Sequence, residues 1–444
     1  MSSRLACLAG LCLAALLAGC QKKVQTVDLV VLTPHTDKIK DEFKRAFGEW
    51  HQQRHGAPAV IEWRSVGGGT QAKQFILQQY GQTDSSGMDI YWGGGDADHK
   101  LLAERGICVP VKLPDELLRE IPATLAGIRQ YDEQGRWYGT TLSCFGILYN
   151  AKLLRQNNLP IPRGWEDLAT PAMFGRVAAA RANLSSSACM AYEMLIQAEG
   201  DWQAGWATLL KFWANCKQFT NGASDVAGDV ANGEVLAGAA IDFYAYTQIA
   251  VSGTNLGFVS VQGKTAFTPD PISVLKGAPH AEMAKRFVEF VLSAQGQALW
   301  CLPPGAPDGP KQYALYREPI RRDLYAKYEG KMLPVLQNPF NQAGDFKLNS
   351  EVAMVRVGHL LGPLMQAAAI DSQPHMVKAW KTIIAAGCPA DLVKEFTALP
   401  ADLSDEATAL ATARKLADAK EAERITSAWQ RYFREKYERL AKAR

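Results

Sequence analysis

The chain has 444 residues, of which 48% are hydrophobic and 21% are charged, an ordinary composition for a globular protein of two or more domains. Its 48 Lys and Arg nearly balance its 45 Asp and Glu, and a net charge of +3 gives no electrostatic footprint of a nucleic-acid-binding protein. No run of about 18 or more apolar residues follows the N-terminus, which excludes a polytopic membrane protein.

The first residues have the layout of an export signal. Arg4 precedes an apolar stretch over 5–18, as in a secretory signal peptide. The letters LAGC at 17–20 resemble the bacterial lipobox, and this resemblance implies that Cys20 is lipidated and becomes the N-terminus. We therefore expect a signal peptide over 1–19, a tether over 20–26 and a lipid anchor on the outer side of a bacterial membrane. A plain signal peptide or a short buried helix is the alternative, and the choice between inner and outer membrane stays open.

Six of the nine cysteines lie beyond this segment. Their spacings match neither CxxC nor a metal-ligand pattern, so no zinc site is expected. An exported compartment permits disulfides, and the pairing stays open. The six are Cys108, Cys144, Cys189, Cys216, Cys301 and Cys388.

The chain then alternates strands and helices. Residues 27–33 form a nearly continuous β-branched run, typical of a buried parallel strand, and a helix follows from Thr36 or Asp37. Further strands are expected at 59–66 and 88–92, each ending in a glycine-rich loop before a helix. This repetition predicts a doubly wound α/β sheet, whose ligands bind at the carboxyl ends of the strands.

A second unit of the same kind begins with strands at 137–143 and 145–149. Its other elements are expected to be a strand at 176–180, helices at 185–200, 203–217 and 225–232, and strands at 235–241 and 257–261. A strand at 272–275 returns to the first sheet, followed by helices at 281–292 and 294–301. The remainder is predicted to be helical, mainly over 350–370, 375–386 and 404–441.

Two loops of the first unit are candidate ligand-binding sites. Gly68, Gly69 and Thr70 lie between a strand and a helix, where free N–H groups and the helix dipole favour an anion. Gly95 and Asp96 follow the same geometry after the third strand. The alternatives are a tight structural turn for the first loop and a helix cap for Asp96.

The second unit offers a run of hydroxyl groups. Ser185, Ser186 and Ser187 open a helix, and their hydroxyls together with the helix dipole suit a phosphate, sulfate or carboxylate. The alternative is that one of them only caps the helix. His35 follows the first strand, and Asp270 lies on the return loop between two prolines, so both are candidates at the cleft.

The order of several motifs resembles the type II periplasmic solute-binding proteins of ABC importers, close to the ferric-iron and spermidine or sugar-phosphate branches. The motifs cover about 27–305 and are MDIYW at 88–92, GGD at 94–96, LLAERGI at 101–107, RWYG at 136–139, ILYN at 147–150, GWEDL at 164–168, FG at 174–175, APH at 278–280 and FVEFVLS at 287–293. The tail from Pro310 onward matches none of the family pattern.

The resemblance implies two lobes joined by crossover strands near 138–143 and 266–272, with the ligand held in the cleft between them. Lobe 1 is expected over 27–139 and 267–310, lobe 2 over 140–266, and a helical extension over 311–444.

The resemblance also bears on the ligand. Ferric-binding relatives use two adjacent tyrosines, a histidine and an acid, and the matching positions here are Tyr244, His35 and Asp96. The first tyrosine of the pair is replaced by Phe243, preceded by Asp242, so one phenolate is missing. We therefore expect Asp242 and Tyr244 to hydrogen-bond the hydroxyls or an amine of an organic solute. The expected ligand is an organic anion or a phosphorylated sugar, with ferric iron as the alternative. Thr33 and Ser143 complete the expected ligand-binding set.

The sequence thus predicts a monomeric, lipid-anchored solute-binding protein without a cofactor, which delivers a small molecule to an ABC permease in the inner membrane. We find no GxSxG, HExxH or Cys/His arrangement, so no enzyme is expected, although the scaffold also hosts enzymes. A third alternative is a signalling or docking lipoprotein, in which the helices over 404–441 bind a partner instead of the protein's own lobes.

Overall fold

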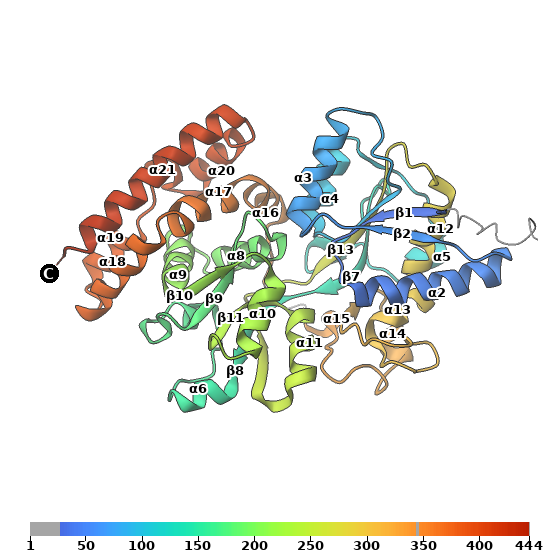
Figure 1. Cartoon of the computed structure of the whole chain (residues 1–444), viewed down its shortest axis with the longest axis horizontal. Coiled ribbons are helices and arrows are strands. Elements are labelled where there is room, and N and C mark those ends of the chain that lie inside the picture. The colour runs from blue at the N-terminus through green and yellow to red at the C-terminus, as the bar shows by residue number, and fades with distance from the viewer. Residues whose placement is uncertain (1–26, 343–345, 444) are drawn as a thin grey trace, which may run out of the picture.

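The computed structural model describes residues 27–342 and 346–443, and it confirms the predicted two-lobed α/β fold. Figure 1 shows the lobes side by side, with a helical C-terminal unit covering the outer side of the second lobe. The predicted signal peptide, Cys20 and the tether lie outside the described residues.

Lobe 1 is built on one mixed sheet with the order β14-β7-β13-β3-β1-β2, and β4 pairs with β13. β1 is parallel to both neighbours, as predicted, whereas β13 returns from lobe 2 and runs antiparallel to β3 and β7. The strands are β1 (Leu29–Leu32), β2 (Ile61–Arg64), β3 (Ile90–Trp92), β4 (Cys108–Val109), β7 (Tyr138–Ser143), β13 (Thr268–Leu275) and β14 (Glu318–Pro319), beside a small hairpin of β5 (Thr124–Leu125) and β6 (Ile128–Arg129). The helices are α2 (Asp37–His55), α3 (Gly69–Tyr80), α4 (Asp96–Glu104), α5 (Asp115–Leu118), α12 (Ala281–Leu292), α13 (Ala294–Cys301), α14 (Asp323–Lys327) and α15 (Pro339–Gln342).

Lobe 2 has its own sheet with the order β10-β9-β11-β8-β12. Its strands are β8 (Phe145–Asn150), β9 (Val177–Ala180), β10 (Cys216–Thr220), β11 (Ala237–Ile241) and β12 (Leu256–Ser260). Its helices are α6 (Ala151–Gln156), α7 (Trp165–Leu168), α8 (Ser186–Ala198), α9 (Trp202–Asn215), α10 (Ala223–Ala231) and α11 (Asp242–Ser252), with short 3₁₀ turns η1 (Pro171–Met173) and η2 (Gly253–Asn255). The helix expected over 203–217 ends earlier, because Cys216 already begins an edge strand that pairs with β9.

The two lobes are joined where β7 continues into β8 and where β12 leads into β13. β7 and β13 lie side by side as an antiparallel pair, in which Ser143 is opposite Thr268. The register shifts between Pro269 and Pro271, so Asp270 lies at an irregularity in this hinge pair. The change of lobe therefore falls at about residue 144, a few residues later than the predicted boundary at 139.

The expected C-terminal extension divides between the lobes. Residues 311–342 stay on lobe 1, where β14 pairs with β7. Residues 346–443, which we call the C-terminal unit, pack on lobe 2. The unit contains α16 (Ser350–Val355), η3 (Arg356–Leu360), α17 (Leu361–Met365), η4 (Gln366–Ile370), α18 (Gln373–Ala385), α19 (Ala390–Thr397), η5 (Ala401–Leu403), α20 (Glu406–Lys415) and α21 (Ala419–Leu440).

The segment predicted as helical over 404–441 is two helices. The first ends at Lys415, and Asp418 begins the second, because its side chain accepts hydrogen bonds from the amides of Lys420 and Glu421. The apolar residues of both helices pack against the protein's own core, which is the alternative to binding a partner.

One described helix, Ser350–Ile370, is long and apolar enough to cross a membrane by length and composition. About 61% of its most apolar window is buried inside the protein, against α8 and α21. Two π-helical stretches, η3 and η4, interrupt it. Its burial identifies it as a core helix of the C-terminal unit.

All six cysteines of the described part of the chain are free thiols. Five are buried and Cys388 is half-buried, so they act as small apolar side chains in the cores.

Candidate functional site

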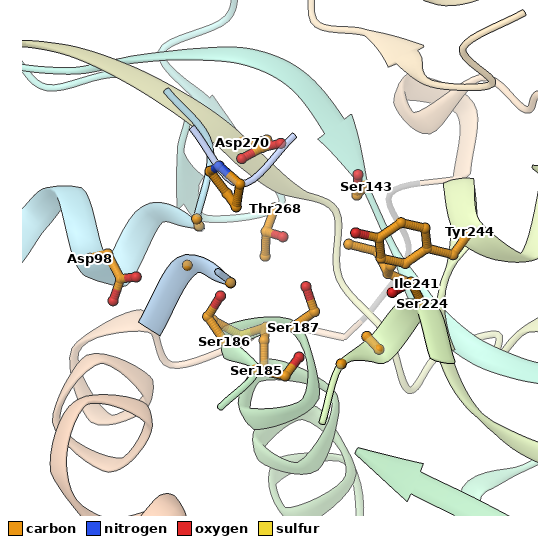
Figure 2. Close-up of a pocket in the computed structure, with 18 of the residues that line it drawn as sticks. Asp98, Ser143, Ser185, Ser186, Ser187, Ser224, Ile241, Tyr244, Thr268 and Asp270 are labelled. Atoms are coloured by element: carbon orange, nitrogen blue, oxygen red, sulfur yellow. The ribbon is translucent and has the colours of Figure 1, made fainter. Parts of the chain in front are cut away.

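A cavity of about 390 Å³ lies between the lobes, at the carboxyl ends of the lobe 1 strands. Its lobe 1 side comes from the loops that begin α3 and α4, and its lobe 2 side from the first turns of α8, α10 and α11. The hinge strands supply Ser143, Thr268 and Asp270 as its floor (Figure 2).

Most of the residues predicted for the site line this cavity. They are His35, Gly68, Gly69, Gly95, Asp96, Ser143, Ser185, Ser186, Ser187, Tyr244 and Asp270. They come from seven separate segments of the chain, so the fold brings together what the sequence only places at strand ends.

Three predicted residues do not line the cavity. The Thr33 hydroxyl is buried and accepts the amide of His35 at 3.1 Å. Thr70, the second residue of α3, does not line the cavity. Asp242 is fully buried and accepts the amides of Cys144 at 2.6 Å and Phe243 at 2.7 Å. These three residues lie outside the lining of the cavity, and Thr33 and Asp242 bond to the backbone instead.

The lobes touch each other at two glycines of the first loop. A Cβ on Gly69 would lie 2.7 Å from the Ser186 hydroxyl oxygen and 2.7 Å from the Gly94 Cα. A Cβ on Gly68 would lie 2.9 Å from the Leu184 carbonyl oxygen. Glycine is thus required here for close approach of the lobes, and the structure describes the closed arrangement.

Backbone amides of both lobes face the closed cavity. Among the described residues, the first-turn amides of Gly69 in α3, of Ser186 and Ser187 in α8, and of Ser224 in α10 have no hydrogen-bond partner. Ser185 only caps its helix, because its hydroxyl accepts the Ala188 amide at 3.3 Å. Figure 2 shows the hydroxyls of Ser186 and Ser187 directed into the space between the lobes. Such an arrangement is suited to an oxyanion.

Arg317 is a cavity residue that the sequence did not predict. Its side chain is only 1% exposed, and its Nη1 lies 2.7 Å from the Asp270 Oδ2. Its Nη2 donates to the Ser143 hydroxyl at 3.0 Å, and the guanidinium lies 4.1 Å from the centre of the Phe243 ring. Arg317 therefore joins both hinge strands and a lobe 2 aromatic ring. It lies beyond every family motif, and no local pattern marks it.

The floor of the cavity is electrically balanced. Burial alone would raise the pKa of Asp270, but Arg317 and His35 outweigh burial and hold this pKa below its usual value. Burial lowers the pKa of His35, whose Nε2 lies 3.0 Å from Asp270, and so disfavours the imidazolium. One guanidinium thus faces one carboxylate, and the floor adds little net charge.

Two of the predicted alternative ligands of ferric iron, His35 and Asp96, are paired with other side chains. The His35 Nε2 is bonded to Asp270, and the Asp96 Oδ2 lies 2.5 Å from the Lys100 Nζ. Burial raises the pKa of Tyr244, which disfavours a phenolate. Within 27–342 and 346–443 no three His, Cys, Asp or Glu residues are grouped closely enough to hold a metal ion.

Comparisons with known proteins agree with this geometry. The family model described as bacterial extracellular solute-binding protein matches residues 96–314. The phosphoglycerate transport regulatory protein PgtC of Salmonella typhimurium is 29% identical over 215 residues, which are 47% of this chain and 53% of that protein. An uncharacterized protein of Haemophilus influenzae is 26% identical over 277 residues, 61% of this chain and 74% of its own length. The chain spans about half the length of the PgtC relatives that it matches.

Solved structures show the same fold at low sequence identity. The periplasmic binding protein AfuA of Actinobacillus pleuropneumoniae, with fructose-6-phosphate bound, has a TM-score of 0.61 and 18% identity, covering 80% of this chain and 98% of its own. Iron-bound HitA of Pseudomonas aeruginosa has a TM-score of 0.56 and 20% identity, covering 75% and 100%. The family match over part of the chain and the two-lobed type II fold together make the chain similar to the bacterial extracellular solute-binding proteins.

Proposed function

We propose that the chain captures a small organic anion, a phosphorylated or carboxylated solute, and delivers it to an ABC permease. The observation that carries this proposal is the convergence of unpartnered first-turn amides and serine hydroxyls from both lobes on one closed cavity. Each helix N-terminus favours negative charge. Several of them together balance the charge of an oxyanion without an unpaired lysine or arginine side chain.

The size and polarity of the cavity support an organic solute. A volume of about 390 Å³ falls in the range of small-molecule sites, and it exceeds what one metal ion needs. Tyr244 and Thr268 bring further hydroxyl groups to the wall (Figure 2), which suits a solute with hydroxyls of its own. The names of two similar proteins point the same way: PgtC is named for phosphoglycerate transport, and AfuA was solved with fructose-6-phosphate.

Ferric iron remains the second candidate, because HitA shares the fold and was solved with iron. The donor set described above disfavours it: His35 and Asp96 are each bonded to a charged side chain, and Arg317 places a cation at the floor. We propose capture without chemistry, and hence no enzymatic activity.

We further propose that the protein acts as a monomer held to the membrane by a lipid on Cys20. Metabolic labelling with a radioactive fatty acid tests the anchor: the wild type should take up label, and Cys20→Ala should not. Label on Cys20→Ala would contradict this assignment.

The ligand is tested by titration calorimetry with 3-phosphoglycerate, fructose 6-phosphate and ferric citrate. We expect at least one organic phosphate to bind, and Ser186→Ala with Ser187→Ala to weaken it by 10-fold or more, since a hydrogen bond to a charged group contributes about 1.5–3 kcal/mol. Ser252→Ala, in the last turn of α11 and outside the cavity, is the matched control and should bind as the wild type does. Tight binding of iron alone, unchanged by the serine substitutions, would contradict the proposal.

A further inference from the structure

The turn that leads into α8 packs against the long helix Ser350–Ile370. The Met365 Sδ lies 3.2 Å from the amide nitrogen of Ala182, which donates to it. The Asn183 Nδ2 donates to the Gln366 Oε1 at 3.3 Å. Gly362 lies so close that a Cβ added to it would be 3.3 Å from the Asn183 Cα. All these contacts fall on residues directly before the serines that face the cavity.

The same helix also reaches the cavity and lobe 1. Val357, in the π-helical turn η3, lines the ligand cavity. A smaller cavity of about 210 Å³ lies at the junction of η3 and α20 with lobe 1, where it is bordered by His359 and by the Lys73–Asp98 ion pair. That pair has a separation of 2.7 Å and side chains only 10% and 2% exposed. A π-helical turn at such a junction is a feature often found at functional sites.

The C-terminal unit is firmly joined to lobe 2. Arg356 forms an ion pair with Glu193 of α8 at 2.9 Å, and both side chains are almost fully buried. The Trp380 Nε1 donates to the Asn215 Oδ1 at 2.8 Å. Because the unit and lobe 2 share one core, they move together when the hinge strands bend.

From these contacts we infer that the C-terminal unit is a working wall of the ligand cleft: it positions the turn that presents Ser186 and Ser187, and it closes the cleft against α4 of lobe 1. This inference rests on the proposed capture of an anion by that turn. It makes the C-terminal helices determinants of affinity, although only Val357 of the unit lines the cavity.

Gly362 and Gly358 both lie in the long helix and provide a test position and a control position. A side chain at Gly362 must press on Asn183, whereas a Cβ at Gly358 meets nothing within 4 Å. In a helix interior, replacing glycine by alanine is favourable by about 1 kcal/mol at either position, so helix propensity is controlled. We compare Gly362→Leu and Gly362→Ala with Gly358→Ala in the full-length protein.

The first readout needs no ligand. Hydrogen exchange at the hydrogen-bonded amides of Ser185, Ala188 and Cys189 should be at least 10-fold faster in Gly362→Leu than in Gly358→Ala. The second readout is the affinity for inorganic phosphate, which should fall by 10-fold or more in Gly362→Leu and change far less in Gly358→Ala, where the added Cβ meets nothing within 4 Å. Folded Gly362→Leu protein with unchanged exchange would overturn the inference.

Gln366→Ala provides a second test in case the Gly362→Leu variant does not fold. It removes the bond to the Asn183 side chain and a second exposed bond, to Asp371, and it should speed exchange of the same amides several-fold while leaving the melting temperature unchanged. If this variant exchanges as the wild type does, the turn is not positioned by the unit. A wild-type protein that fails to bind phosphate would count against the proposed function, while the exchange comparison still decides the inference.

Discussion

The two lobes share an architecture but complete their cores differently. The lobe 1 core gathers Phe43, Trp92, Phe287 and Trp300 from elements that all belong to that lobe. The lobe 2 core continues without interruption into the C-terminal unit, so that Trp213 of α9 and Trp380 of α18 belong to one apolar cluster. The C-terminal unit is therefore a second layer of lobe 2 and not an appended domain.

Helix α9 shows why lobe 2 needs this layer. It packs on α7, α8 and β9 on its inner side and on α18 and α19 on its outer side. Its sequence carries Trp202, Trp206, Phe212 and Trp213 around the helix, a distribution that a helix with one solvent-facing side does not show. Without the C-terminal unit, a large apolar face of lobe 2 would be exposed to water.

The largest effect is expected from removing this layer. A chain truncated after Gln342 should lose the cooperative unfolding transition of lobe 2, because α8 and α9 would expose apolar surface that is now buried. Differential scanning calorimetry measures this. A truncated protein that keeps the full unfolding enthalpy and melting temperature would show that the C-terminal unit is an independent domain after all.

Single tryptophans sharpen the comparison between the lobes. Trp380→Ala, in the C-terminal unit, and Trp300→Ala, in lobe 1, each remove a fully buried ring at a cost of about 3–5 kcal/mol. We expect Trp380→Ala to lower the transition of lobe 2 together with the unit, and Trp300→Ala to lower that of lobe 1. If Trp380→Ala leaves hydrogen exchange within α8 unchanged, the shared core is not an energetic unit.

A smaller loss is expected from the ion pair that joins the unit to α8. Arg356→Met leaves Glu193 buried without its cationic partner, which costs about 3 kcal/mol. Burial already raises the pKa of Glu193, so protonation limits the loss. The double variant with Glu193→Gln should recover most of the stability in urea unfolding. Equal losses in the single and double variants would mean that Arg356 acts through its packing on Trp202 and not through its charge.

The smallest effect is expected at the boundary between the lobes, and it depends on pH. Burial, together with the nearby Asp242 carboxylate, raises the pKa of Glu318 well above its ordinary value of 4.5. Neither Glu318 carboxylate oxygen has a partner among the described residues. A raised carboxyl pKa favours the folded state at low pH, so stability should decline as the pH rises above about 4.5. Glu318→Gln should flatten this decline in melting temperature between pH 5 and pH 8, and a variant that declines as steeply as the wild type would contradict the assignment.

Much of the fold and part of the site could be predicted from local patterns. The strand runs before the glycine loops at Gly68 and Gly95 are local signals, and parallel strands bring their carboxyl ends to one edge. Ser186 and Ser187 were predicted for the same reason, since they open a helix. The sequence does not show which way Asp242 faces, because a carboxylate at a strand end faces either the ligand or the backbone, and the Cys144 amide that donates to it is brought near only by the fold.

The rest of the site depends on long-range packing. Arg317 reaches the cavity because β14 pairs with β7, a contact between residues far apart in the chain. The contacts of Gly362 and Gln366 with Asn183 likewise join segments about 180 residues apart. No periodicity or spacing in the sequence carries such information.

The central claim is that the cleft holds an organic anion, and native mass spectrometry tests it most directly. The protein, with Cys20 replaced to make it soluble, is exported in its own host, purified without refolding and weighed in native and denatured form. We predict a mass difference that matches a phosphorylated or carboxylated organic solute and is lost in the variant with Ser186→Ala and Ser187→Ala. A difference matching one iron atom, with or without a small anion, would contradict the account and restore Tyr244, His35 and Asp96 as metal ligands.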